Sequence, residues 1–510
     1  MKKINKIFRN SLLLFLLILV GCTSNFDDIN TNPDATTNPS PSMVCTTVIL
    51  KNIKFNGRDA MAYLDPNLLS KYVGFANQSQ QPSQYNSIGS SDFGAITILP
   101  NIDQMVARAS GSVMENSYKG IAKFSRAYMF YYLTMQMGDI PYSEANQGLI
   151  GNFRPKYDTQ EQVFLGILNE LKEADQFFAN GIKFDGDPTP YAGDPAKWRR
   201  ASNAFALRVL MSLSKKADLA SLNVKQRFAD IVASGQLLEP TTGFLGLNYS
   251  TTNIHPMSGT NDLFTSRTDM STVLVDNLKA LNDRRLFYFA DPSAKKIAGG
   301  LTQTDMAAYV GVDPSIDYAT MTANHLAGEY SLLNSRYLKE AAVEPRMMVT
   351  YAEQQLILAE ARIKGWITTS TAKDYYESGV KSALGAYKPL ATTNVHGMAI
   401  TDAYINGYFT GEAAFKSATD DQLKQIWMQR YILNFMQDAT MAYFEFRRTG
   451  YPVFPLNPAT NLNQNNPNGF PMRWLYPSSE TNANRANLIE ALNRQYEGYD
   501  EINKLMWILK

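Results

Sequence analysis

Cysteine and histidine are scarce in this sequence. Its 510 residues include 2 cysteines, Cys22 and Cys45, and 3 histidines, His255, His325 and His396, which lie far apart. Neither set has the spacing of metal ligands. Nucleophile elbows, phosphate-binding loops, zincin helices and EF-hand loops are also absent. The sequence therefore predicts no catalytic residue, no metal and no cofactor.

Charge of either sign is limited as well. Only 19% of the residues are charged, the formal net charge is +1, and no block of like charge is long enough to form a tail. A nucleic-acid-binding protein normally carries a basic surplus on one face, so this balance argues against that class. The hydrophobic fraction of 45% predicts a folded core, and the length allows two or three lobes.

The apolar run at the N-terminus, residues 12–20, is too short to span a bilayer as a stable helix. It follows a basic start formed by Lys2, Lys3, Lys6 and Arg9. A basic segment followed by a short apolar segment and a small residue is typical of a signal peptide. The sequence therefore predicts export from the cytoplasm.

The last residues of this segment, 19–22, read Leu-Val-Gly-Cys and resemble the lipobox of bacterial lipoproteins. In that class the signal peptide is cleaved before the cysteine, which is lipidated on its sulfur and its new amino group. Each buried methylene of an acyl chain contributes about 0.8 kcal/mol to membrane binding. The alternative is an ordinary signal peptide with an incidental cysteine. If Cys22 is lipidated, Cys45 has no cysteine partner and the chain has no internal disulfide.

Composition changes again after the cysteine. Residues 23–42 are rich in Asn, Thr, Pro, Ser and Asp, which is typical of a polar tether, and a hydrophobic pattern begins near Val44. We therefore expect a signal peptide at 1–21, a tether at 22–42 and a folded domain at 43–510.

Apolar residues at steps of three or four predict a mostly α-helical domain. In one segment Ile121, Phe124, Tyr128, Tyr131 and Met135 form a single stripe that we expect to face the core. The clearest predicted helices cover residues 117–137, 159–180, 194–216, 350–365, 372–387 and 421–448.

Several of these helices begin at a recognisable cap. Thr159 with Gln162, and Thr350 with Glu353, have the spacing of a capping box. Asp194 precedes a proline, which favours an N-cap followed by proline at the first helical position. Paired helices of this length resemble tetratricopeptide hairpins, although the strict repeat consensus is absent.

Long segments rich in Gly, Ser, Thr, Asn, Tyr and Pro separate the helical regions. They cover residues 67–100, 237–265, 291–337 and 455–487. Long irregular segments in a compact protein usually form functional surface or packed excursions. We expect a helical scaffold that carries large loops.

Eight stretches together resemble the SusD/RagB family of surface lipoproteins, and most closely its SusD-like, starch-binding-associated branch. They follow the family order and cover nearly the whole chain after Cys22. The stretches are FDDINTNP (26–33), GDIPYSEA (138–145), PKYDTQ (155–160), YAGDPAKW (191–198), LNDRRL (281–286), EQQLILAEA (353–361), FEFRRTGYP (444–452) and RWLYP (473–477).

The resemblance implies a lipid-anchored protein on the outer face of the outer membrane. Such proteins partner a SusC-like TonB-dependent transporter, close over its barrel, and deliver oligosaccharides or, in some members, peptides. The family scaffold has four tetratricopeptide-like helix pairs with a loop-rich ligand-binding part. Asp27 and Asp28 are similar to the family's surface-export signal. The shared motifs themselves have turn or helix-end patterns, so we expect them to serve the architecture or the transporter interface.

Two chemical alternatives stay open. Asp185, Asp187 and Asp194 could offer oxygens to calcium, but turn-forming and helix-capping roles also explain them. A surface glycoside hydrolase would need paired carboxylates, and 47 acidic residues allow many pairs without marking one. A binding protein that is not an enzyme is the favoured interpretation, ahead of a hydrolase or a helical adaptor that binds only proteins.

A sugar site needs aromatic faces beside hydrogen-bonding side chains, and aromatic residues make up 12% of this chain. Candidates must lie in loops, because the aromatic residues of helical stripes are expected in the core. Ordinary packing remains the alternative for each ring. The candidate ligand-binding residues are Tyr72, Phe75, Asn77, Gln78, Gln81 and Tyr85 in a first patch, Tyr249, Asn253 and His255 in a second, and Tyr330.

Overall fold

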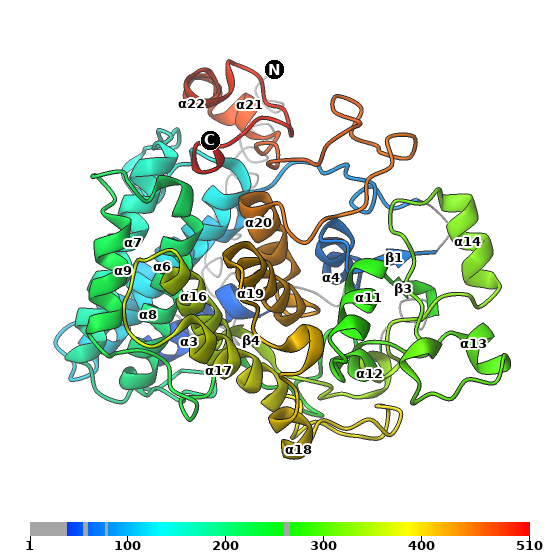
Figure 1. Ribbon diagram of the computed structural model, residues 1–510. Coiled ribbons are helices and arrows are strands. Elements are labelled where there is room, and N and C mark those ends of the chain that lie inside the picture. Colours follow the sequence, from blue (N-terminus) through cyan, green and yellow to red (C-terminus); the bar gives the residue numbers. More distant parts are fainter. Residues whose placement is uncertain (1–37, 55–59, 77–79, 260–265) are drawn as a thin grey trace, which may run out of the picture.

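The computed structural model describes residues 38–54, 60–76, 80–259 and 266–510, and these are mainly helical, as the apolar periodicity predicted (Figure 1). The predicted signal peptide, Cys22, most of the tether, Asn77 and Gln78 lie outside the described residues. Within these ranges no helix is long and apolar enough to cross a membrane.

The helices up to residue 280 are α3 (Pro41–Ile53), α4 (Ala60–Leu69), α5 (Leu99–Ala109), α6 (Glu115–Met137), α7 (Gln160–Ala179), α8 (Pro195–Ser212), α9 (Val224–Ala233) and α11 (Thr272–Ala280). The later helices are α12 (Arg285–Phe289), α13 (Ala294–Ala298), α14 (Tyr318–Leu326), α15 (Arg336–Lys339), α16 (Tyr351–Ile363), α17 (Ala372–Gly385), α18 (Asp402–Asn406), α19 (Thr419–Asn434), α20 (Ala439–Thr449), α21 (Glu480–Ala483) and α22 (Arg485–Tyr496). Short 3-10 helices are η1 (Gly94–Ile98), η2 (Gly148–Ile150), η3 (Ser214–Lys216), η4 (Met306–Ala308), η5 (Gly411–Ala413) and η6 (Trp507–Leu509).

Strands are few and short. The described residues contain β1 (Val73–Phe75), β2 (Leu245–Leu247), β3 (Thr268–Met270) and β4 (Arg346–Val349). They form two antiparallel pairs, β1 with β3 and β2 with β4. The second pair fixes the backbone of Arg346, which lies opposite Leu247.

The helices pack as hairpins, which confirms the predicted tetratricopeptide-like scaffold. In the α6–α7 pair, Gln160 Nε2 donates to the carbonyl oxygen of Thr134 at 2.9 Å, and at the other end Asn116 Nδ2 donates to that of Asn180 at 3.2 Å. The two helices are therefore antiparallel. Helices α16 and α17 form a similar pair (Figure 1).

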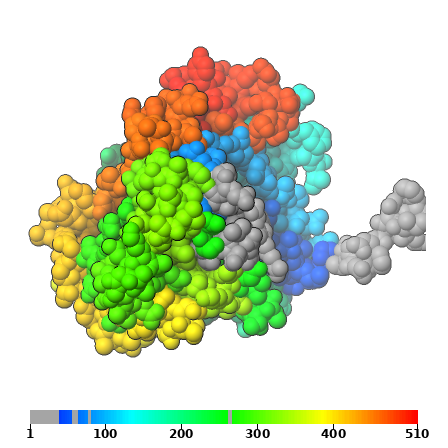
Figure 2. Space-filling model, turned by 90° about the vertical axis from the view of Figure 1, so that its right-hand side faces the viewer, coloured from blue at the N-terminus to red at the C-terminus, as the bar shows by residue number. Residues whose placement is uncertain are grey.

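The loop-rich part lies on one side of these hairpins. Figure 1 shows α11 to α14 and the β1–β3 pair on the side away from α6 to α9, and Figure 2 shows α13 and α14 projecting from that face. The segment around Leu462 crosses the loop that holds Tyr85, where the Leu462 amide donates to the Tyr85 carbonyl at 2.9 Å. The excursions are thus packed against one another.

The capping predictions at the first helices are confirmed. Thr159 and Gln162 form both bonds of the capping box at the start of α7. Asp194 caps α8 by accepting from the Ala196 amide at 2.9 Å. Helix α8 ends at Ser212 rather than at residue 216, because residues 214–216 form the 3-10 turn η3.

The second capping box is only half formed. Thr350 caps α16 by accepting from the Glu353 amide at 3.1 Å. The Glu353 carboxylate instead accepts from Arg208 Nε on α8 at 2.8 Å. A buried guanidinium is a stronger partner for a carboxylate than a backbone amide, so the tertiary contact replaces the local one.

The predicted helix over residues 421–448 is wrong in one respect, because the chain breaks into α19 and α20. Met436 has a φ of 56° and Asp438 caps α20 by accepting from the Met441 amide at 3.1 Å. Hydrogen bonds from α4 and from the residue after it stabilise the backbone between α19 and α20. Tyr63 donates to the Met436 carbonyl, and Ser70 donates to the Ala439 carbonyl at 2.6 Å.

Two hydrophobic clusters form the core. One is built mainly on α3 and α5 to α8, and the other mainly on α4, α11, α12 and α16 to α20. The indole of Trp474 packs against both clusters. Cys45, the one cysteine of the described residues, is fully buried in the first cluster as a free thiol.

Buried charges also join the helices of the scaffold. Glu360 on α16 is fully buried and accepts from both terminal nitrogens of Arg448 on α20, at 2.6 and 2.9 Å. Arg430 on α19 lies 3.5 Å from Glu360 and 2.7 Å from Glu445. Burial opposes ionisation of Glu360, but Arg448 and Arg430 outweigh it and lower its pKa. The carboxylate is therefore held in its charged form.

Two of the three aspartates considered for calcium have structural partners. Asp187 accepts from the Gly193 amide at 2.8 Å and from the Trp198 indole at 2.7 Å, and Asp194 is the cap of α8. No group of three or more His, Cys, Asp or Glu side chains suited to a metal ion occurs in the described parts of the chain.

Candidate functional site

Two adjoining pockets form one groove, which we call the central groove. Their volumes are about 400 and 460 Å³, and Gln136, Thr440 and Trp474 line both. Pockets of this size match the range of small-molecule sites. The further lining residues are Asp65, Pro66, Leu69, Gln81, Pro82, Ser83, Ser87, Ile88 and Gly89 in one pocket, and Lys51, Asn52, Ser90, Ser91, Asp92, Ala95, Tyr128, Met129, Tyr132, Leu133, Arg346 and Asp438 in the other.

Aromatic rings form one wall of the groove. Tyr128 and Tyr132 lie one turn apart on α6, with ring centroids 4.9 Å apart. Trp474 is half-buried and is supported from behind by Phe444, whose ring meets it edge-on at 6.2 Å. The Trp474 amide donates to the Gln136 carbonyl at 2.9 Å, which fixes the backbone of this tryptophan beside α6. The rings are therefore held in place by the scaffold.

Charged groups lie beside this wall. The Tyr132 hydroxyl donates to Asp438 Oδ2, so the break between α19 and α20 brings a carboxylate to the groove. Arg346, the first residue of β4, also lines the groove. Burial lowers the pKa of Arg346, but Tyr128 and Asp438 outweigh it and raise that pKa above its usual value. The guanidinium thus stays charged.

The polar rim comes from α3, α6 and the loop before η1. Ser91 Oγ donates to Gln136 Oε1 at 2.5 Å, and Asn52 donates to the Ser125 carbonyl at 3.2 Å. Lys51 and Asp92 add one charge of each sign. Flat rings, amides and a balanced set of charges can hold a polyhydroxylated ligand, whose C–H groups stack on rings while its hydroxyls meet polar side chains.

Of the first patch predicted from the sequence, Gln81 lines the central groove. Tyr72, Phe75 and Tyr85 are at most 1% exposed. Tyr72 stacks on Tyr431 at 4.2 Å and belongs to the core with Phe75. The Tyr85 hydroxyl donates to a backbone carbonyl at 3.0 Å. The structure places these three rings in packing roles, which was the alternative for each.

The three residues of the second patch, Tyr249, Asn253 and His255, lie in one short segment after β2. The ring of Tyr249 is 4.9 Å from that of His255, and Asn253 is exposed, with its amide donating to the Asn248 carbonyl at 3.1 Å. His255 is buried, and burial with the nearby arginines lowers its pKa to about 3. His255 is therefore neutral at physiological pH. Tyr330 lies elsewhere, half-buried on a small cluster around Met321.

Sequence reasoning missed the aromatic wall. Tyr128 belongs to the apolar stripe of its helix, which predicted a core position, and Trp474 lies in a stretch that we expected to serve the architecture. Tyr132 lies off the stripe, and this was the one available signal that a ring on α6 faces outward. Arg346 and Asp438 had no signal in the sequence.

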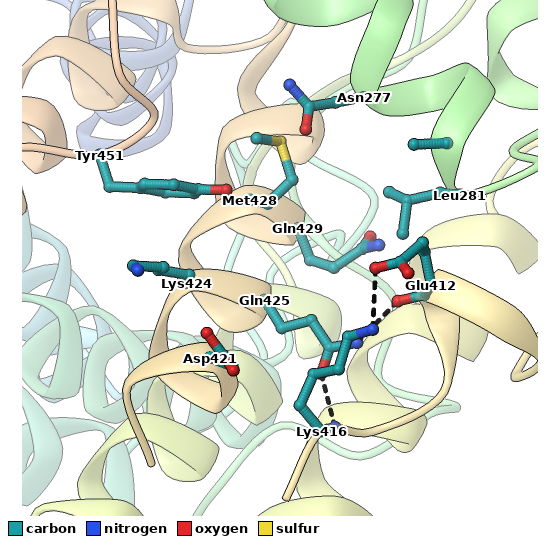
Figure 3. A pocket seen from close by; sticks show the side chains of 11 residues that line it. Asn277, Leu281, Glu412, Lys416, Asp421, Lys424, Gln425, Met428, Gln429 and Tyr451 are labelled. Atoms are coloured by element: carbon teal, nitrogen blue, oxygen red, sulfur yellow. Dashed lines mark hydrogen bonds and ion pairs between the residues drawn. The ribbon is translucent and has the colours of Figure 1, made fainter. Parts of the chain in front are cut away.

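A separate pocket of about 350 Å³ lies between the end of α11, η5 and α19 (Figure 3). Three of its polar residues, Glu412, Lys416 and Gln425, bind one another. Gln425 donates to the Glu412 carbonyl at 3.0 Å, and Lys416 pairs with the Glu412 carboxylate at 2.8 Å. Tyr451 is the single aromatic ring in its described lining. The central groove, with three rings and a half-buried arginine, is the better candidate site.

Comparison with known proteins places the chain in a family. Residues 33–477 match a family model described as "Starch-binding associating with outer membrane", of the SusD-like type. No curated protein sequence matches the chain significantly.

Solved structures give the same result. A SusD homolog from Bacteroides fragilis is 38% identical, with a TM-score of 0.88 over 92% of this chain and 100% of that one. A second SusD homolog from the same species is 31% identical, with a TM-score of 0.80 over 93% of this chain and 100% of that one. A chitin-binding SusD homolog from Flavobacterium johnsoniae shares the fold, with 17% identity, a TM-score of 0.72 and coverage of 92% and 98%. The chain belongs to the SusD-like family of nutrient-binding outer-membrane proteins.

Proposed function

We propose that the central groove binds an oligosaccharide and that the chain delivers it to a SusC-like TonB-dependent transporter. The observation that carries this proposal is the wall formed by Tyr128, Tyr132 and Trp474 beside fixed polar groups. The groove's charges are nearly balanced, which favours a neutral glycan over a strongly anionic one. Of the residues selected from the sequence, Gln81 is the one we assign to this site.

Two alternatives make different predictions. A peptide ligand is the alternative within the family. Arg346 and Asp438, which both line the groove, offer one charge of each sign to the polar groups of a peptide. A surface glycoside hydrolase is the less favoured alternative. Asp438 accepts from Tyr132 and from the Met441 amide, so its oxygens already serve a helix cap, which supports binding without hydrolysis.

Isothermal titration calorimetry of the purified chain against a panel of neutral and acidic glycans and of mixed peptides tests the ligand class. Saturable binding of a neutral glycan, with no release of reducing ends, is the expected result. Binding of peptides alone would replace the sugar version of the proposal with the peptide version. Release of reducing ends that a single carboxylate substitution abolishes would favour the hydrolase.

The expected anchor is Cys22, with a signal peptide at 1–21 and a polar tether that leads to the domain; α3 begins at Pro41, close to the proposed boundary at 43. Cys22→Ala should move the protein from the outer-membrane fraction to the soluble fraction and leave its thermal unfolding unchanged. Fractionation followed by immunoblotting measures this. Cys45→Ala is the matched control and should stay in the membrane fraction. Persistent membrane association of the Cys22 variant would refute the lipid anchor.

A further inference from the structure

The loop around η2 carries its large apolar side chains outward. Leu149, Ile150 and Phe153 are 89%, 79% and 77% exposed. Single exposed apolar residues are ordinary on protein surfaces, but three within five positions form a patch that marks an interaction site. We call these three residues the apolar loop.

Polar side chains hold the conformation of this loop from inside. Asn152 Nδ2 donates to Glu144 Oε2 and to Gln147 Oε1, both at 3.0 Å. Glu144 also accepts from the Lys156 amide at 3.0 Å. Gly151 has a φ of 87°, which favours glycine in this turn. The loop is thus preorganised with polar groups inward and apolar groups outward, the reverse of an ordinary surface turn.

The apolar loop borders a shallow apolar groove of about 390 Å³. Its walls include Phe93, Ile96, Pro100, Pro141 and Leu149. Helix η1 separates this groove from the central groove, because Ala95 lines the central groove whereas its neighbour Ile96 lines the apolar one. The two grooves are therefore neighbours, one on each side of η1.

The charges around the patch favour a protein over a lipid surface. Lipid-binding surfaces are typically rimmed by Lys and Arg, whereas charges of both signs border this patch. Arg154 and Lys156 are exposed just after Phe153. Glu480 lines the apolar groove, and Asp103 accepts from its lining residue Asn146 at 2.5 Å. The tether also joins the domain at the opposite end of α5, where Arg108 donates to the Pro39 carbonyl at 3.0 Å. This helix has 11 residues and is roughly 16 Å long.

We infer that the apolar loop and its groove are the docking surface for the partner transporter, with an apolar pocket on the transporter's extracellular loops as the occupant. This inference rests on the proposed function. An apolar centre with a polar rim is the usual anatomy of a protein interface. Three preorganised anchors are expected to contribute much of the binding free energy.

The test uses the tagged full-length chain expressed in its native cells and purified in mild detergent. The wild type should co-purify with a TonB-dependent barrel identified by mass spectrometry. The triple variant L149S/I150S/F153S should recover about 10-fold less of that barrel. Its glycan affinity and thermal unfolding should match the wild type, because the three side chains touch neither the central groove nor the core. L326S/V453S is the matched control, since Leu326 and Val453 are 69% and 77% exposed on other elements.

Each result has a distinct meaning. Equal barrel recovery by the wild type and the triple variant would overturn the inference and leave the proposed function standing. A wild type that recovers no barrel would overturn both. Binding of the Cys22→Ala chain to vesicles of lipopolysaccharide and phosphatidylethanolamine, lost in the triple variant, would identify a lipid contact and overturn the inference.

Discussion

Replacing Glu360 by alanine is expected to lower the free energy of unfolding by about 3–5 kcal/mol, because two buried guanidinium groups lose one of their carboxylate partners. Arg448 and Arg430 would then share Glu445, which lies 2.6 and 2.7 Å from them. Glu360 binds both terminal nitrogens of Arg448 and lies 3.5 Å from Arg430. Both arginines are at most 9% exposed, so water cannot replace the lost carboxylate. Urea denaturation followed by circular dichroism measures the change.

Glu377→Ala is the matched control for this experiment. Glu377 lies on the neighbouring helix α17 and pairs with Lys373 and Lys381, at 3.7 and 3.8 Å near the surface. Surface pairs of this kind contribute about 0–1 kcal/mol. If the two variants lose similar stability, the buried network is not what joins α16, α19 and α20.

The Glu360 network also predicts a pH dependence. The folded-state pKa of Glu360 is lowered, so its contribution to stability is present above the ordinary carboxyl pKa and is lost as pH falls through the folded value. The difference in stability between wild type and Glu360→Ala should therefore shrink in acid. This comparison requires only that the urea titrations be repeated at lower pH.

Trp474→Ala is expected to weaken glycan binding by about 10- to 100-fold, or about 1.4–2.8 kcal/mol. The indole is the one aromatic side chain that lines both halves of the central groove. Removing it deletes a stacking surface and leaves the polar groups that orient the ligand. Calorimetry with the glycan selected from the panel gives the affinity.

Trp427→Ala controls for the loss of a tryptophan, because Trp427 lies half-buried on α19 and does not line the groove. Trp474→Phe should retain part of the affinity, since a ring remains. Thermal unfolding of each variant ensures that binding is compared among folded proteins. Unchanged affinity in Trp474→Ala would remove the central groove as the ligand site.

Local signals explain why much of the scaffold could be predicted. Thr159, Gln162 and Asp194 specify helix starts through bonds within a few residues, so their pattern in the sequence is sufficient. The break at Met436 is different, because Tyr63 and Ser70 hold it from a distant part of the chain. No glycine or proline marks it. Tertiary contacts therefore decided the feature that the sequence could not reveal.

The site was harder to predict for the same reason. The rule that loop aromatics are available to ligands failed where loop residues pack against the helical scaffold, as Tyr72 does on Tyr431 of α19. The rule that aromatic residues of a helical stripe lie in the core excluded Tyr128 from the candidates. Tyr128 is mostly buried, yet it lines the groove. The central groove is assembled from α3, α4, η1, α6, β4, α20 and the loops between elements, so no single stretch of sequence carries its signature.

The position of Trp474 between the two hydrophobic clusters has a mechanical consequence. Its indole packs against both clusters and also lines the central groove. A glycan bound on Trp474 would therefore be coupled to both clusters. We expect it to stabilise the whole domain against unfolding rather than one half of it. The stabilisation would follow RT ln(1 + [L]/Kd) and would reach about 2.7 kcal/mol at a hundredfold excess over Kd.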